Sequence, residues 1–112
     1  MYVSEFIKLV RQDVGDGVAE YRWSDQDMLD KINVARCFLF GKRPAAFCVS
    51  TIATEEPLPF TEANLRSSLD VLGLFVPPLQ SYVAYLLLRE DVDDAASQTL
   101  AMNFFEAFKI QV

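Results

Sequence analysis

The stretch of sequence that decides the fold is "RWSDQDMLDKINVARCFLFGKRP", residues 22–44. Ser24 is a favourable helix N-cap, and Asp27, three positions later, completes a capping box. Trp23 precedes the cap and is placed to pack on Met28, an arrangement known as a hydrophobic staple. The tryptophan therefore has a structural role, and the stretch predicts a helix that begins at Ser24.

The apolar residues that follow recur at the spacing of one helix face. They are Met28, Ile32, Ala35 and Leu39, flanked by Leu29 and Phe38. Asp27 and Lys31 are predicted to pair across one turn on the opposite face, and the other charged residues are expected to be solvated. Gly41 and Pro44 then stop the helix.

A paired-carboxylate site is the alternative interpretation of the same stretch. Asp25, Asp27 and Asp30 lie close together in sequence, but no neighbouring residue marks an environment that would give two carboxylates different acid and base roles. We therefore expect these side chains to form the solvated face and the cap of a helix.

Length and composition predict a single domain over residues 1–112 with one hydrophobic core. Apolar residues make up 52% of the chain, slightly more than the roughly 45–50% of an ordinary domain, and the surplus suggests partner surfaces. No apolar run approaches the roughly 20 residues that cross a membrane, and the start of the chain lacks the features of a secretory signal. We expect a soluble chain without membrane contact, made and kept in the cytoplasm.

Charge and cysteine content exclude several classes of function. Sixteen acidic and ten basic residues give a net charge of −6, and the scattered cations do not form the stripe that binds phosphates tightly. An acidic wall repels a passing duplex, so proximity to DNA is still possible. Cys37 and Cys48 stand without any histidine, which argues against zinc; we expect two reduced, mostly buried thiols and neither metal nor cofactor.

The first half of the chain outside this stretch predicts one further helix and one extended segment. Val3, Phe6, Ile7, Val10 and Val14 line one side of a helix, and "GDG" at 15–17 breaks it. Residues 45–54, "AAFCVSTIAT", alternate between two faces and are rich in β-branched side chains, which favours a short strand or hairpin. The prolines of "TEEPLPF" (54–60) exclude a helix there.

The second half predicts three more helices. Leu65, Leu69 and Leu72 indicate a helix over 62–72, capped by Thr61 and ended by Gly73. Pro77 and Pro78 suit the first turn of the next helix, which continues through 79–91 with apolar residues on both faces. Asp93 or Asp94 caps the last helix, whose stripe of Leu100, Ala101, Phe104, Phe105 and Phe108 is more typical of core than of a partner contact. The predicted fold is mainly α: a small bundle of four to five helices, a short central β segment and a C-terminal tail at about 109–112.

Two blocks of the sequence resemble phage head-to-tail adaptor proteins, also called head-completion or connector proteins. In "WSDQDMLDKINVARCFLFGKRPAA" the match is carried by Trp23, Asp25, Leu29, Ile32, Asn33, Ala35, Arg43, Pro44 and Ala46. In "LQSYVAYLLLREDVDDAASQTLAMNFFEAF" it is carried by Tyr85, Arg89, Asp91, Ala101, Phe104, Phe105 and Phe108. The blocks cover roughly 22–46 and 76–109, and in the middle only "PLPF" (57–60) matches the longer β-rich insert of the family.

The resemblance implies a structural virion protein of the neck, assembled in the host cytoplasm. Such proteins form a ring, twelve copies in relatives, below the portal protein; the ring extends the DNA channel and docks the tail or stopper, while the genome passes without tight binding. The resemblance makes "FFEAFKIQV" (104–112) the candidate portal or subunit contact, with Phe104, Phe105, Phe108, Lys109, Ile110 and Val112 as its residues.

Two other classes of function stand beside this expectation. A small helical regulatory or protein-interaction module would use the same aromatic stripe. An enzyme is not expected, because the chain has no histidine, no Gly-rich phosphate loop and no Ser or Cys in a nucleophile motif.

Overall fold

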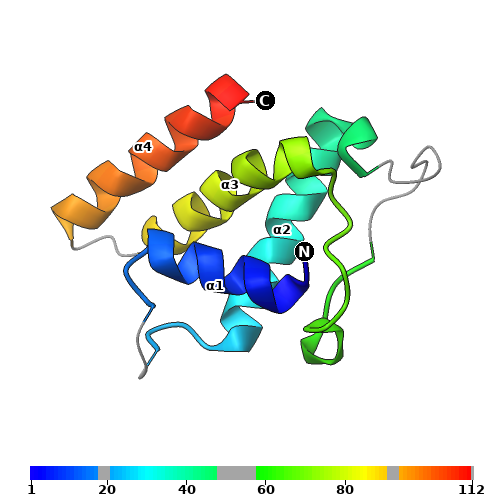
Figure 1. Cartoon of the computed structure of the whole chain (residues 1–112). Helices are drawn as coiled ribbons and strands as arrows, with labels where there is room; N and C mark the ends of the chain where they lie inside the picture. Colours follow the sequence, from blue (N-terminus) through cyan, green and yellow to red (C-terminus); the bar gives the residue numbers. More distant parts are fainter. Residues whose placement is uncertain (18–20, 48–57, 91–93, 112) are drawn as a thin grey trace.

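The computed structural model describes residues 1–17, 21–47, 58–90 and 94–111. Four α-helices make up most of the described chain (Figure 1). They are α1 (Val3–Asp13), α2 (Asp25–Lys42), α3 (Val76–Leu88) and α4 (Ala95–Gln111), joined by the short 3-10 helices η1 (Pro44–Phe47), η2 (Glu62–Asn64) and η3 (Gly73–Phe75). The mainly helical class is therefore confirmed. No helix within the described ranges combines the length and the apolar character that spanning a membrane requires.

Helix α2 begins as its sequence predicts. The Asp27 N–H donates to the Ser24 hydroxyl at 3.1 Å, and the Ser24 N–H donates to the Asp27 carboxylate at 3.3 Å. Trp23 keeps only 7% of its surface exposed and Met28 keeps none, as a hydrophobic staple requires. Because Asp27 turns back to form this capping box, Lys31 pairs with Glu90 beyond α3 instead of with Asp27, and that part of the prediction is wrong.

Helix α1 ends in a glycine-dependent turn, also as predicted. Gly15 has a φ of +75°, a conformation that favours glycine. The Asp16 N–H donates to the Arg11 carbonyl at 2.7 Å and the Gly15 N–H to the Gln12 carbonyl at 3.4 Å. These two bonds form a Schellman motif, which satisfies the last carbonyls of the helix and turns the chain away.

The helix predicted over 62–72 does not form. In such a helix the Leu65 carbonyl would accept from the Leu69 N–H; instead, Leu65 and Ser67 carbonyls accept from the first N–H groups of α1, each at 2.9 Å, and the Leu69 N–H donates to the Met1 carbonyl at 2.8 Å. The segment is thus a backbone cap for α1, with an isolated β-bridge between Tyr2 and Ser68. Only η2, with Thr61 as its N-cap, remains of the prediction.

The predicted strand at 45–54 is wrong over its first residues. Residues 44–47 form η1, whose Ala46 N–H donates to the Arg43 carbonyl at 3.0 Å while its carbonyl accepts from Leu72. The remainder of the strand prediction, 48–54, lies outside the described residues, as does Cys48. Cys37 is exposed, so its predicted burial is wrong: it lies on the outer face of α2, opposite the core positions.

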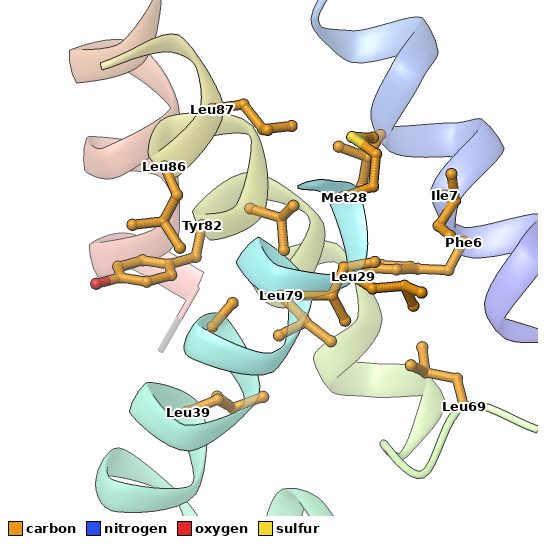
Figure 2. Packing of buried hydrophobic residues seen from close by; sticks show 14 of the residues in the cluster. Phe6, Ile7, Met28, Leu29, Leu39, Leu69, Leu79, Tyr82, Leu86 and Leu87 are labelled. Carbon is orange, nitrogen blue, oxygen red and sulfur yellow. The ribbon is translucent and has the colours of Figure 1, made fainter. Parts of the chain in front are cut away.

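Helix α3 is the centre of the fold, as Figures 1 and 2 show. Prolines occupy its first turn, as predicted, and eight of its residues are buried on several sides. They are Pro78, Leu79, Tyr82, Val83, Ala84, Leu86, Leu87 and Leu88. Helices α1, α2 and α4 each lie against it, and Phe6 and Ile7 of α1 reach the same core as Met28 and Leu29 of α2.

Helix α4 lies antiparallel to α3 at the edge of the molecule (Figure 1). Asp94 is its cap, one of the two predicted: its carboxylate accepts from the Ala96 N–H at 3.0 Å and from the Ser97 hydroxyl at 3.1 Å. The hydroxyl bond and then the backbone bonds lower the pKa of Asp94, so this side chain is charged at neutral pH.

Replacing Leu29 by alanine is expected to lower the free energy of unfolding by about 2–5 kcal/mol, because it leaves a cavity in a core position with no exposed surface. The matched control is Leu58→Ala, since Leu58 is 83% exposed and should change stability by no more than about 0.5 kcal/mol. Urea unfolding followed by circular dichroism measures both. Equal effects of the two substitutions would contradict this description of the core.

Candidate functional site

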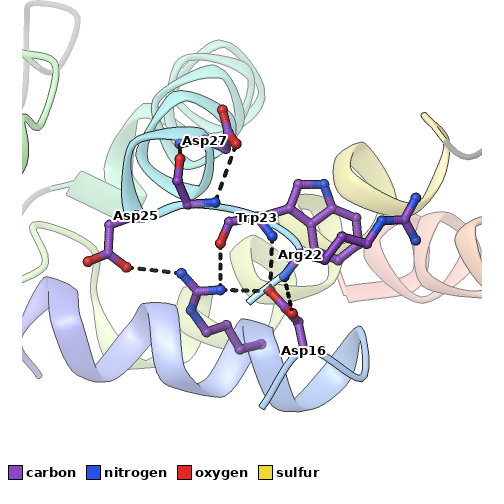
Figure 3. Close-up of polar contacts among 7 residues, drawn as sticks. Asp16, Arg22, Trp23, Asp25 and Asp27 are labelled. Carbon is purple, nitrogen blue, oxygen red and sulfur yellow. Dashed lines mark hydrogen bonds and ion pairs between the residues drawn. The ribbon is translucent and has the colours of Figure 1, made fainter. Parts of the chain in front are cut away.

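The first polar cluster lies around the buried Arg11 and joins the end of α1 to the start of α2. Figure 3 shows Asp16, Trp23 and Asp25 at this junction. Its guanidinium donates to the Asp16 carboxylate at 2.7 Å, to the Trp23 carbonyl at 2.7 Å and to the Asp25 carboxylate at 3.0 Å. Asp16 in turn accepts from the Arg22 N–H at 2.7 Å and the Trp23 N–H at 3.3 Å. The cluster therefore fixes the backbone that carries the tryptophan.

The second polar cluster surrounds Arg36, which is 2% exposed in the middle of α2. Its guanidinium forms a two-point ion pair with Asp70 and donates to the Leu58 carbonyl at 2.8 Å. It also lies over the Phe60 ring, 3.7 Å from the centroid. The arginine therefore fixes two loop segments against the helix.

Asn33, one turn before Arg36, completes this second cluster. Its amide donates to the Phe60 carbonyl at 2.9 Å and accepts from the Phe60 N–H at 2.8 Å, so a single side chain satisfies both backbone groups of one residue. Arg36 donates to the same Asn33 oxygen at 3.0 Å. This geometry gives a physical reason for an asparagine at the position that the resemblance singled out, because only an amide donates and accepts side by side.

A third cluster is aromatic and joins α2, α3 and α4. Tyr82 stacks on Phe38, with ring centroids 4.6 Å apart, and meets Phe108 at 4.8 Å. Tyr85 meets Phe105 at 4.8 Å. Burial is the main cause that raises the pKa of Tyr82, with Tyr85 adding to the rise and Arg89 opposing it. These contacts attach α4 to the rest of the protein.

The candidate contact residues of the C-terminal segment do not share one environment. Phe108 is 3% exposed and belongs to the core, and Phe104 and Phe105 are partly buried against it. Lys109 is half-exposed and pairs with Glu106 at 2.9 Å, while Ile110 is 85% exposed. Val112 lies outside the described residues. Of the apolar members of this set that are described, Ile110 has the most surface to offer a partner.

The other residues singled out by the resemblance have structural positions. Leu29 is fully buried. Arg43 is the C-cap of α2, its N–H donating to the Leu39 carbonyl at 2.7 Å, and Pro44 opens η1. Arg89 is the C-cap of α3 and lies 5.3 Å from the Tyr85 ring centroid. Of these residues, Arg43 lines a cavity of about 320 Å³ together with Phe108 and Lys109 of the C-terminal segment.

The carboxylates of α2 are separated into unrelated roles. Asp25 pairs with Arg11, Asp27 caps the helix, and Asp30 accepts from Gln26 at 2.9 Å. A cavity of about 400 Å³ lies beside the first cluster, between α1 and the segment that leads to α2; Lys8, Gln12 and Tyr21 are among its lining residues. In the described part of the chain, no three histidine, cysteine or acidic side chains are grouped as metal ligands would be.

Sequence reasoning missed the two buried arginines and their partners Asp16 and Asp70, and expected Arg36 to be solvated. A usable signal exists: Arg11 follows Ile7 by four residues, and Arg36 stands between Ile32 and Leu39, so each cation interrupts an apolar face. The sequence gives no such signal for the partners of these arginines, because a partner such as Asp70 lies 34 residues from Arg36.

Comparison of the chain with protein-family models, with curated proteins and with solved structures finds no match. A function therefore has to be argued from the residues themselves.

Replacing Asp70 by alanine is expected to lower the free energy of unfolding by about 3 kcal/mol, because the buried Arg36 guanidinium then lacks an opposite charge. The value lies at the low end for a broken buried pair since Asp70 is itself about one-third exposed. Asp30→Ala, at an exposed carboxylate of α2, is the control and should change little. Equal effects in urea unfolding would show that the ion pair does not hold these segments.

The raised pKa of Tyr82 predicts a loss of stability in alkali. The neutral phenol is favoured in the folded state, so its contribution is complete below the ordinary pKa of 10.0 and is lost as the pH rises through the folded value. Tyr82→Phe should remove this alkaline loss, whereas Tyr21→Phe, at a half-exposed tyrosine, should keep it. Urea unfolding across the alkaline range tests both variants; an unchanged slope in Tyr82→Phe would refute the assignment.

Proposed function

We propose that the chain is a structural virion protein, a head-to-tail adaptor that forms a ring below the portal of a phage head, extends the DNA channel and docks the tail or stopper. The observation that carries the proposal is the occurrence of both sequence blocks in the family order, over 22–46 and 76–109. Each block alone is a helical pattern that many unrelated proteins could match. Two such blocks in the family order are stronger support for the adaptor family.

The roles of the block residues support the proposal. Trp23, Asp25 and Asn33 each make contacts that depend on the residue type, because they involve a buried indole, a carboxylate facing a guanidinium and a two-way amide. A sequence that matched by helical periodicity alone would not need these types. The same contacts would suit a small helical interaction module, so a direct test on phage heads is required.

Surface properties also agree with an assembly component. Several large apolar side chains are exposed, among them Val34, Leu58, Leu74 and Ile110, and contacts between proteins are commonly built on such surface. The net charge of −6 suits a channel through which DNA slides without adhering.

Purified protein is expected to restore infectivity to DNA-filled heads that lack it, and Ile110→Asp is expected to abolish this rescue, since a carboxylate would be buried in the portal contact. The substitution should change the free energy of unfolding by no more than about 0.5 kcal/mol, because Ile110 is exposed. Infectious titre and electron micrographs of the neck measure the result.

Met102→Asp is the matched control, at a half-exposed residue of the same helix outside 104–112. It should rescue as the wild type does. Heads that join tails without any added protein would remove the adaptor proposal and favour the interaction module. Full rescue by Ile110→Asp would show that Ile110 does not contact the portal, and it would leave the adaptor proposal itself in place.

A further inference from the structure

Helix α2 carries a second stripe of small and apolar residues, on the face turned away from the core. Val34 is 52% exposed, and Cys37 and Gly41 are also exposed. We call these three residues the outer stripe. Phe38 lies beside the stripe, where it stacks on α3 and still keeps 36% of its surface exposed. Charged and polar residues ordinarily occupy the outer face of a surface helix, so the stripe requires an explanation other than the fold.

The outer stripe has the spacing of a seam between two helices. Val34, Cys37 and Gly41 follow one another at intervals of three and four residues, and Asp30 continues the series four residues earlier. This alternation of three and four residues is typical of helices that pack lengthwise at about 20° to each other. A Cβ atom at Gly41 would meet nothing within 4 Å, so a second helix has room to approach closely there.

Charge determines which helix fits the outer stripe and in which direction it runs. Asp30, at one end of the stripe, is exposed and accepts a hydrogen bond from the neutral Gln26 amide. Lys42, next to Gly41 at the other end, is exposed and lies 5.5 Å from the Phe38 ring centroid. Within the described ranges, neither Asp30 nor Lys42 forms an ion pair. A second α2 that runs antiparallel would place these opposite charges together at both ends, whereas a parallel one would place like charges together.

We infer that the outer stripe of α2 binds the outer stripe of a second copy of this chain, with the two helices antiparallel about a two-fold axis. Val34 of each copy then faces Cys37 of the other, and Asp30 of each faces the end that carries Lys42. The contact is isologous, so association stops at two copies. Such a closed pair does not fit a ring in which every copy points in one direction. The inference therefore concerns the free chain and does not rest on the adaptor proposal.

Val34→Asp tests the outer stripe. Sedimentation equilibrium should show that the wild type forms a two-copy species as its concentration rises. The variant should associate at least about 10-fold more weakly, because it places a carboxylate in the apolar seam. The matched control is Met102→Asp on α4, since Met102 is 51% exposed and Val34 is 52% exposed. The control should associate as the wild type does, and both variants should keep the wild-type circular dichroism spectrum.

Exchange of the two end charges tests the antiparallel direction. Asp30→Lys places two lysines together at each end of the pair, and Lys42→Asp places two carboxylates there. At low salt each variant alone should associate about 3- to 30-fold more weakly than the wild type. An equal mixture of the two variants restores opposite charges at both ends. The mixture should therefore form a pair of one copy of each, with the strength of the wild type.

A thiol crosslink tests the position of the contact. The chain has two cysteines, so Cys37 is the only thiol in a Cys48→Ser variant. A short bismaleimide should link two copies of this variant through Cys37, and the addition of Val34→Asp should remove the linked product. Two-copy association without this crosslink would assign the pair to another surface and overturn the inference.

The remaining outcomes are equally decisive. A wild type that stays monomeric at about 1 mM, or a charge-exchanged mixture that associates no better than its components, would overturn the inference. Association that continues beyond two copies and is lost in Val34→Asp would assign the stripe to a heterologous contact, and would also overturn the two-fold pair. None of these measurements uses phage heads. Failure of the pair therefore leaves the adaptor proposal in place, and failure to rescue heads leaves the pair in place.

Discussion

The burial of α3 on several sides is the constraint on which the rest of the structure depends. No residue of this helix from Val76 to Leu88 carries a charge, and eight of its side chains are buried. A helix of that kind is stable only when other elements cover its faces. Helices α1, α2 and α4 provide the cover, since each of them lies against α3. The caps at Ser24 and Asp94 then determine where two of the covering helices start.

The buried arginines follow from the same constraint. The segments that close the bundle, around Trp23 and Leu58, are not helical, so their backbone carbonyls lack the regular partners that a helix supplies. A guanidinium has five donors in a fixed plane and satisfies a carbonyl and a carboxylate together. Arg11 and Arg36 both do so, and every buried side-chain polar atom of the described residues has a partner. At these two places, hydrogen bonds from arginine side chains therefore satisfy the backbone carbonyls that a helix or a sheet would otherwise satisfy.

Prediction from the sequence succeeded where the determining interactions are local. The start of α2, the end of α1 and the prolines of α3 depend on contacts within a few residues, and all three were predicted. The helix over 62–72 failed because its carbonyls bond to the start of the chain, more than 60 residues away. The same holds for the Arg36–Asp70 pair. At the candidate site, residue types were predicted but environments were not: Phe108 lies in the core, whereas Ile110, only two residues later on the other side of the helix, is exposed.

The environment of α4 explains why a stripe of aromatic residues does not distinguish core from interface. Its attachment uses Phe105 and Phe108 against two tyrosines of α3, and within the helix only Ala101 and Phe108 are buried. The opposite side carries Ile110, which is 85% exposed, beside the ion pair of Glu106 and Lys109. Because one side already holds the helix in place, the other side is able to bind a partner without unpacking the core. The sequence stripe therefore cannot decide between core and interface, because one helix carries buried and exposed apolar side chains on two different faces.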